Sequence, residues 1–147
     1  MITGNYYNTI SAKTERVIDM LEESFAGYGY EVREEYYKLN AENPVTMPII
    51  TVGIHGISQK SSDTARYLGK SPDGTTVYGK TLMVTYRITV HASASFAYSV
   101  CRSCAAKIAE AFTNSLDVED ITSSEAKYDR YCRCITMPVD ITVKYIV

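Results

Sequence analysis

The sequence has few of the residues from which catalytic and metal centres are built. His55 and His91 are the only histidines in 147 residues, and neither stands in an H-E-x-x-H or E-x-x-H pattern. There is no G-x-S-x-G nucleophile turn and no glycine-rich phosphate loop. These absences argue against the common hydrolase, metallopeptidase and nucleotide-binding classes. We therefore expect a protein that is not an enzyme, with no catalytic residue, no metal and no cofactor.

Long apolar runs are missing as well. No segment approaches the ~20 consecutive apolar residues of a membrane-spanning helix, and residues 1–16 lack the basic region and apolar core of a signal peptide. The formal net charge of −2 argues against binding nucleic acid by broad electrostatics. We expect one domain over residues 1–147, in a reducing cytoplasm and without a membrane partner.

Two segments have the apolar spacing of amphipathic helices. In residues 8–26 the apolar stripe consists of Ile10, Val17, Ile18, Leu21 and Phe25. Gly27 and Gly29 then predict the end of this helix. In residues 94–116 the stripe consists of Phe96, Val100, Cys104, Ile108 and Phe112.

Other segments predict strands. Residues 81–93 alternate most clearly, with one face made of Leu82, Val84, Tyr86, Ile88, Val90 and Ala92. Strands are also expected at 30–39, 48–58 and 138–147, with an edge strand or hairpin over 118–135 that turns near "YDR". This order predicts an α+β fold: a mostly antiparallel sheet covered on one face by two helices, with a projecting hairpin or arm.

The arm is expected at residues 58–80. Its "SPDG" is a strong turn signal, because proline suits the second turn position and glycine the fourth. Tyr67 and Leu68 would lie on one leg, and Val77 and Tyr78 on the other. The chain's 13 tyrosines are a weak sign of an interaction protein, because tyrosine joins an apolar ring to a polar tip.

The four cysteines allow three interpretations. Cys101 and Cys104 share a helix face, and Cys132 and Cys134 share a strand face, so zinc could be held if the two pairs met. A redox pair would be expected at a helix N-terminus, whereas this C-x-x-C lies inside a helix. Packing is favoured, because Cys104 belongs to an apolar stripe. If Cys132 and Cys134 face away from the helix, the last strand runs straight and a four-sulfur site is excluded.

Three segments together carry a resemblance to a known family. They are the N-terminal amphipathic helix, "TLMVTYRITVHAS" running directly into "ASFAYSVCRSCAAKIAEAF", and the closing "YDRYCRCITMPVDITVKYIV". In this order they resemble the tail terminator, or tail-completion, proteins of long-tailed bacteriophages and related contractile particles. The resemblance covers most of the chain, concerns element order and texture, and includes no diagnostic motif.

The resemblance implies a structural virion protein. Such a protein would form a ring with itself, expected to be a hexamer, at the head-proximal end of the tail. It would end tail-tube polymerisation and join tail to neck, with the tube protein, the neck or connector protein and, in contractile tails, the sheath as partners. DNA would pass through the lumen without sequence-specific binding. The protein would be assembled in the bacterial host cytoplasm and reside in the tail or neck of the virion.

The resemblance also implies that the arm contacts a neighbouring subunit or the tube. The interface residues expected on this basis are Lys60, Arg66, Tyr67, Leu68, Lys70, Asp73, Val77, Tyr78 and Lys80. Alternatives remain open at this stage. They are another neck, connector, tail-tube or baseplate subunit, a small cysteine-dependent zinc-binding protein or thiol enzyme, and a binding module whose tyrosine-rich arm takes a peptide.

Overall fold

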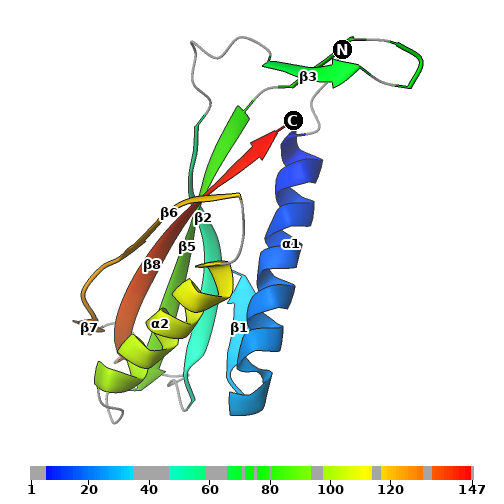
Figure 1. Ribbon diagram of the computed structural model, residues 1–147. Helices are drawn as coiled ribbons and strands as arrows, with labels where there is room; N and C mark the ends of the chain where they lie inside the picture. Colours follow the sequence, from blue (N-terminus) through cyan, green and yellow to red (C-terminus); the bar gives the residue numbers. More distant parts are fainter. Residues whose placement is uncertain are drawn as a thin grey trace.

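One sheet of six strands forms the centre of the protein (Figure 1). The computed structural model describes residues 6–34, 47–58, 66–70, 72–74, 76–79, 81–93, 98–113, 117–130 and 134–146, and at 6–9, 66–70, 76–79, 81 and 146 the backbone alone. The strand order is β1-β2-β5-β8-β6, with β7 also paired to β8. The bounds are β1 Glu31–Glu34, β2 Ile49–Ser58, β5 Thr81–Ser93, β6 Val118–Ser123, β7 Lys127–Asp129 and β8 Cys134–Ile146.

The sheet is antiparallel except at one edge, where β1 runs parallel to β2. Strands β5 and β8 pair without interruption from Thr81↔Ile146 to Ser93↔Cys134. Both β6 and β7 lie along the other side of β8. Strand β8 therefore runs straight over its whole length, and Met137-Pro138 introduces no register shift.

Two helices cover one face of this sheet (Figure 1). They are α1, Tyr6–Phe25, and α2, Tyr98–Thr113. Helix α1 is followed by a short 3-10 helix, η1, over Ala26–Tyr28, which Gly29 ends at a φ of +69°. Glycine has no Cβ to clash in this left-handed conformation, so the predicted stop is explained.

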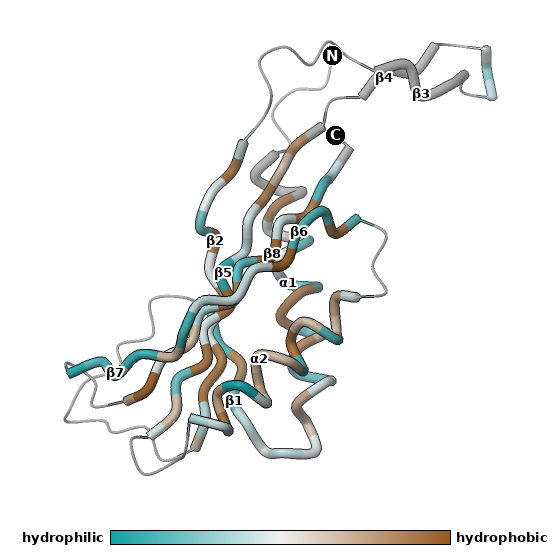
Figure 2. The backbone as a smooth tube through the Cα atoms, turned by 60° about the vertical axis from the view of Figure 1, so that its left-hand side comes forward, coloured by the Kyte–Doolittle hydropathy of each residue, from teal (hydrophilic) through white to brown (hydrophobic). Residues whose placement is uncertain are grey.

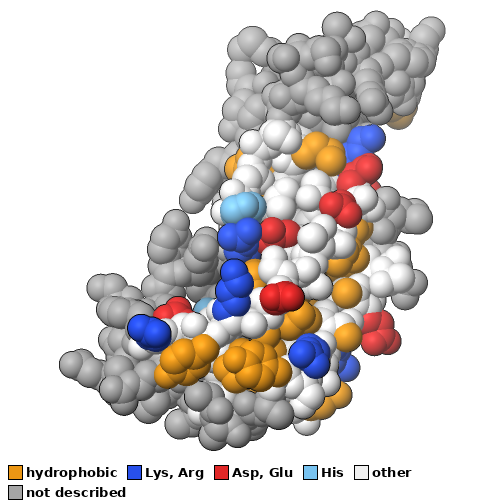
Figure 3. All heavy atoms as spheres, turned by 90° about the vertical axis from the view of Figure 1, so that its left-hand side faces the viewer, with side chains coloured by type: hydrophobic (Ala, Val, Ile, Leu, Met, Phe, Trp, Pro, Cys, Tyr) orange, Lys and Arg blue, Asp and Glu red, His pale blue; other side chains and the backbone are white. Residues whose placement is uncertain are grey.

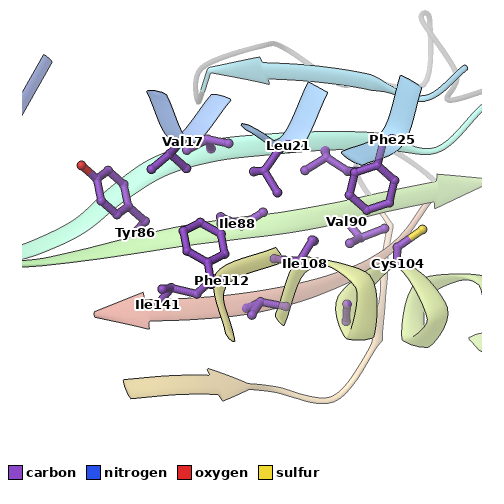
Figure 4. Close-up of a cluster of buried hydrophobic side chains, with 14 of the residues drawn as sticks. Val17, Leu21, Phe25, Tyr86, Ile88, Val90, Cys104, Ile108, Phe112 and Ile141 are labelled. Atoms are coloured by element: carbon purple, nitrogen blue, oxygen red, sulfur yellow. The ribbon is translucent and has the colours of Figure 1, made fainter. Parts of the chain in front are cut away.

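Apolar side chains from both helices and from β5 and β8 meet in one core (Figure 4). The side chains that β5 was predicted to bury, from Leu82 to Ala92, are each at most 4% exposed. Of the predicted stripes, Val17, Leu21, Phe25, Cys104, Ile108 and Phe112 are buried and Ile10, Ile18 and Val100 are half-buried, and α2 also buries Cys101 and Ala105. The predicted α+β fold with two helices on one face is therefore confirmed.

Some predicted boundaries differ from the structure. Strand β1 ends at Glu34, and the rest of the predicted 30–39 strand lies outside the described residues. Helix α2 is described over 98–113 of the predicted 94–116. Hydrophobic stretches recur along the helices and the central strands, whereas β7 is mostly hydrophilic (Figure 2). In the described part of the chain, no helix has the length and apolar character needed to cross a membrane.

Candidate functional site

The arm predicted at 58–80 contains a β-hairpin. Strands β3, Arg66–Lys70, and β4, Thr76–Gly79, pair with each other as a separate two-stranded sheet, antiparallel. The register places Tyr67 opposite Tyr78 and contains an irregularity between Tyr67 and Gly69. Figure 1 shows β3 beyond the end of the six-stranded sheet. The hairpin thus stands apart from the core layer.

The tip of the hairpin is the turn that "SPDG" predicts. Pro72, Asp73 and Gly74 are exposed, and Gly74 has a φ of +86°. A side chain at this φ would be strained, so glycine is required by the turn itself. The residues on β3 and β4 are described by their backbone only, and Lys60 and Lys80 lie outside the described residues. Contacts of the predicted interface residues therefore remain a prediction.

Strand β2 offers an edge next to the arm. Strand β1 pairs with Ile49–Val52 only, so on that side no described strand pairs with Gly53–Ser58. This segment, the outer edge of β2, contains a register shift between Ile54 and Gly56. Ile54 is 37% exposed and Ile57 51% exposed. The alternation along 48–58 correctly predicted that Ile54 lies on the same face of β2 as Ile50 and Val52. It did not indicate that Ile54 and Ile57 would be exposed.

The face of the sheet turned away from the helices, here called the far face, carries an ionic group. Arg87 on β5 donates to both carboxylate oxygens of Asp140 on β8, from Nε at 2.9 Å and from Nη2 at 3.0 Å. Arg87 Nη2 also lies 3.3 Å from His55 Nε2, which accepts. Hydrogen bonds from Arg87 lower the pKa of Asp140. Figure 3 shows histidine, basic and acidic side chains side by side on this side of the molecule.

His91 also lies on the far face, in the adjacent part of β5. Its Nε2 is 3.0 Å from Thr51 Oγ1, whereas its Nδ1 is buried and has no hydrogen-bond partner in the described structure. Burial lowers the pKa of His91 to about 4, against the opposing influence of Asp129. His91 is therefore neutral at pH 7. The position of His91 on its strand did not indicate this neutrality, which follows from desolvation of its half-buried ring.

The three described cysteines do not come together as a metal site, and Cys132 lies outside the described residues. Cys101 and Cys104 are free, and both are buried in α2, where burial raises their pKa values, that of Cys104 to about 11. Cys134 is fully buried and disulfide-bonded. It shares strand parity with Thr136 and Asp140 on the straight strand β8, and thus faces away from α2. Among the described residues, no three His, Cys, Asp or Glu side chains are placed to hold a metal ion.

A cleft between the end of α1 and the first half of α2 was not predicted. It has a volume of about 170 Å³ and is walled by the aromatic rings of Phe25, Tyr28 and Tyr30. Tyr28 belongs to η1 and Tyr30 follows it. This segment is too short to show a periodic pattern from which a cleft could be predicted. The signal in the sequence is the cluster "FAGYGY", in which three aromatic residues fall within six positions.

Comparison with known proteins gives a likeness in structure. No protein-family model matches the sequence, and no curated protein matches it either. A solved structure described as the sheath/tube terminator of an extracellular contractile injection system, PVC, in the extended state is similar with a TM-score of 0.49 and 10% identity. The likeness covers 88% of this chain and 54% of that one, so this chain spans about half of its length. At this level the likeness assigns neither family nor function.

Proposed function

We propose that this protein is a structural subunit of a phage-type tail or a related contractile particle. In this proposal, copies of the chain form a ring at the head-proximal end of the tail, end polymerisation of the tail tube and join the tail to the neck. The ring is a hexamer, and the tube protein, the neck or connector protein and, where the tail contracts, the sheath contact it. DNA passes through the lumen without being read.

The observation that carries the proposal is the hairpin of β3 and β4. It lies between β2 and β5 in the chain and forms its own sheet beyond the end of the main one (Figure 1). A two-stranded hairpin alone is at best marginally stable in water. A hairpin held away from its own core is therefore expected to gain its stability from a neighbouring chain, and the resemblance in sequence implies a subunit-contacting arm at this position.

The outer edge of β2 supports the same conclusion. An unpaired strand edge with exposed apolar side chains is a template for pairing with another chain. Ile54 and Ile57 provide such an edge directly before the arm. Head-to-tail contacts between unlike surfaces close into a ring when the rotation between subunits closes. The arm of one copy and the β2 edge of the next are two unlike surfaces of this kind.

The test measures the mass of the assembled protein and its position on the tail tube. We expect native mass spectrometry of the purified protein, alone and with tubes of the same particle, to give a closed ring. Gold-labelled protein should bind one end of the tube in electron micrographs, and adding it during polymerisation should shorten the tubes. Replacing Tyr67 and Tyr78 with serine should weaken ring formation, whereas Asp120→Asn, an exposed change on β6, should not. A monomer that ignores tube ends would remove the proposal.

A further inference from the structure

The cleft between α1 and α2 has a wall of stacked aromatic rings. The Tyr28 and Tyr30 ring centroids are 5.4 Å apart with planes 27° apart, and Phe25 lies 6.1 Å from Tyr30. Across the cleft, α2 contributes Val100, Cys104 and Lys107. We call this site the aromatic cleft. Phe25 and Cys104 are buried at its floor, whereas Tyr28 is 53% exposed at its mouth.

The size of the aromatic cleft restricts its occupant. Its volume of about 170 Å³ is below the range of about 300–1,000 Å³ that drug-sized ligands and cofactors occupy. It is close to the cavity of about 150 Å³ that takes one benzene molecule in an engineered protein. One aromatic ring fits the space, and its faces and edges would meet rings that favour offset-stacked or edge-to-face packing. The size therefore favours a single side chain of a partner over a free metabolite.

The charge at the mouth restricts the occupant further. Among the described residues that line the aromatic cleft, Lys107 is the one that is charged, and its Nζ lies 5.1 Å from the centroid of the Tyr28 ring. The part of the lining that the structure describes contains no carboxylate, and its other polar groups are the hydroxyls of Ser99, Ser103 and the tyrosines and the Cys104 thiol. A ring flanked by carboxylates would be attracted to the Lys107 ammonium, whereas a ring flanked by ammonium groups would be repelled.

We infer that the aromatic cleft binds a protein partner through one aromatic side chain that has an acidic residue next to it. The site lies around the end of α1 that points away from β3, so it is remote from the arm (Figure 1). Tyrosine is enriched among the residues that dominate binding energy in protein interfaces. The site goes beyond the proposed ring function and stands without it.

Three blocked tripeptides test the inference. Acetyl-Asp-Phe-Asp-amide, acetyl-Lys-Phe-Lys-amide and acetyl-Asp-Ala-Asp-amide are titrated into the isotope-labelled full chain, and amide shifts are followed by NMR. We expect saturable binding of the first peptide, with shifts at Tyr28, Tyr30 and residues 99–107. The second should bind about fivefold more weakly, as the contribution of one exposed ion pair allows, and the third should not bind.

Variants on α2 give the matched control. Ser103 lines the cleft and Arg102 does not, and both side chains are exposed. Ser103→Trp should fill the site and remove binding, whereas Arg102→Trp should leave it intact, with folding of both checked by circular dichroism. Lys107→Glu should reverse the preference between the two Phe peptides.

Three results would overturn the inference. One is equal binding of the Phe and Ala peptides, and another is shifts that remain in Ser103→Trp. The third is a loss of self-association in Ser103→Trp alone, measured by light scattering, which would identify the occupant as a second copy. The first two results leave ring formation and tube-end binding unaffected, so failure of the inference by either of them is distinguishable from failure of the proposed ring function.

Discussion

His91 should make the folded state sensitive to mild acid. Its folded-state pKa of about 4 lies below the ordinary histidine value of about 6.5, because the half-buried ring is desolvated and its Nδ1 is buried with no hydrogen-bond partner among the described residues. Between these two values the unfolded chain binds the proton and the folded chain does not. The contribution of His91 to the free energy of unfolding is therefore present in full above pH 6.5 and falls as the pH is lowered toward 4.

The size of this effect follows from the difference between the two pKa values. Each pKa unit corresponds to about 1.4 kcal/mol, so the contribution of His91 to the free energy of unfolding falls by about 3 kcal/mol between pH 7 and pH 4. That is a large part of the 5–15 kcal/mol typical of a domain. Asp140, whose pKa is lowered, adds a loss of the same sign at still lower pH. The histidine contribution must therefore be isolated by substitution.

Urea unfolding at half-unit pH steps from 7 to 4 measures the effect. We expect His91→Gln, which can still hydrogen-bond Thr51, to lose most of the pH dependence that the wild type shows in this range. His55→Gln, at the exposed histidine of the same face, is the matched control and should retain it. If wild type and His91→Gln gave parallel curves, the burial of Nδ1 would not govern the acid response and the reasoning would be refuted.

Four further predictions concern other parts of the chain. A double-mutant cycle on Arg87→Gln and Asp140→Asn should give a coupling of about 1 kcal/mol by urea unfolding, since both side chains are partly exposed; zero coupling would contradict the ionic group. Ile108→Ala should lower the free energy of unfolding by about 2–5 kcal/mol, because Ile108 is fully buried. Cys104 should react slowly with a thiol reagent at pH 7 and quickly only after unfolding, because burial raises its pKa to about 11; fast reaction of the folded protein would disprove this. Ile57→Lys should change stability by less than about 0.5 kcal/mol and yet reduce ring formation in native mass spectrometry.

Local periodicity predicted most of the fold. The alternation along 81–93 predicted which side chains β5 buries, because a central strand with helices on one side repeats its environment every two residues. The turn chemistry of "SPDG" likewise predicted the hairpin. In both cases the information lies within a few neighbouring residues.

Properties that depend on distant neighbours were not predicted. Cys134 has the parity of the far face and is nevertheless fully buried, which a pattern along one strand cannot reveal. His91 is neutral because the folded chain desolvates its ring, and the aromatic cleft exists only where η1 meets α2. Contacts of the arm residues remain predictions.

The straight pairing of β5 with β8 has a consequence for folding kinetics. Partners in this ladder are separated by 41 residues at one end, Ser93 and Cys134, and by 65 at the other, Thr81 and Ile146. Closing loops of this length must precede any gain from the central contacts, and topologies rich in such distant contacts fold in milliseconds to seconds rather than microseconds. During that interval β5 has apolar residues without their partner strand. The folding chain is therefore most exposed to aggregation before β8 docks.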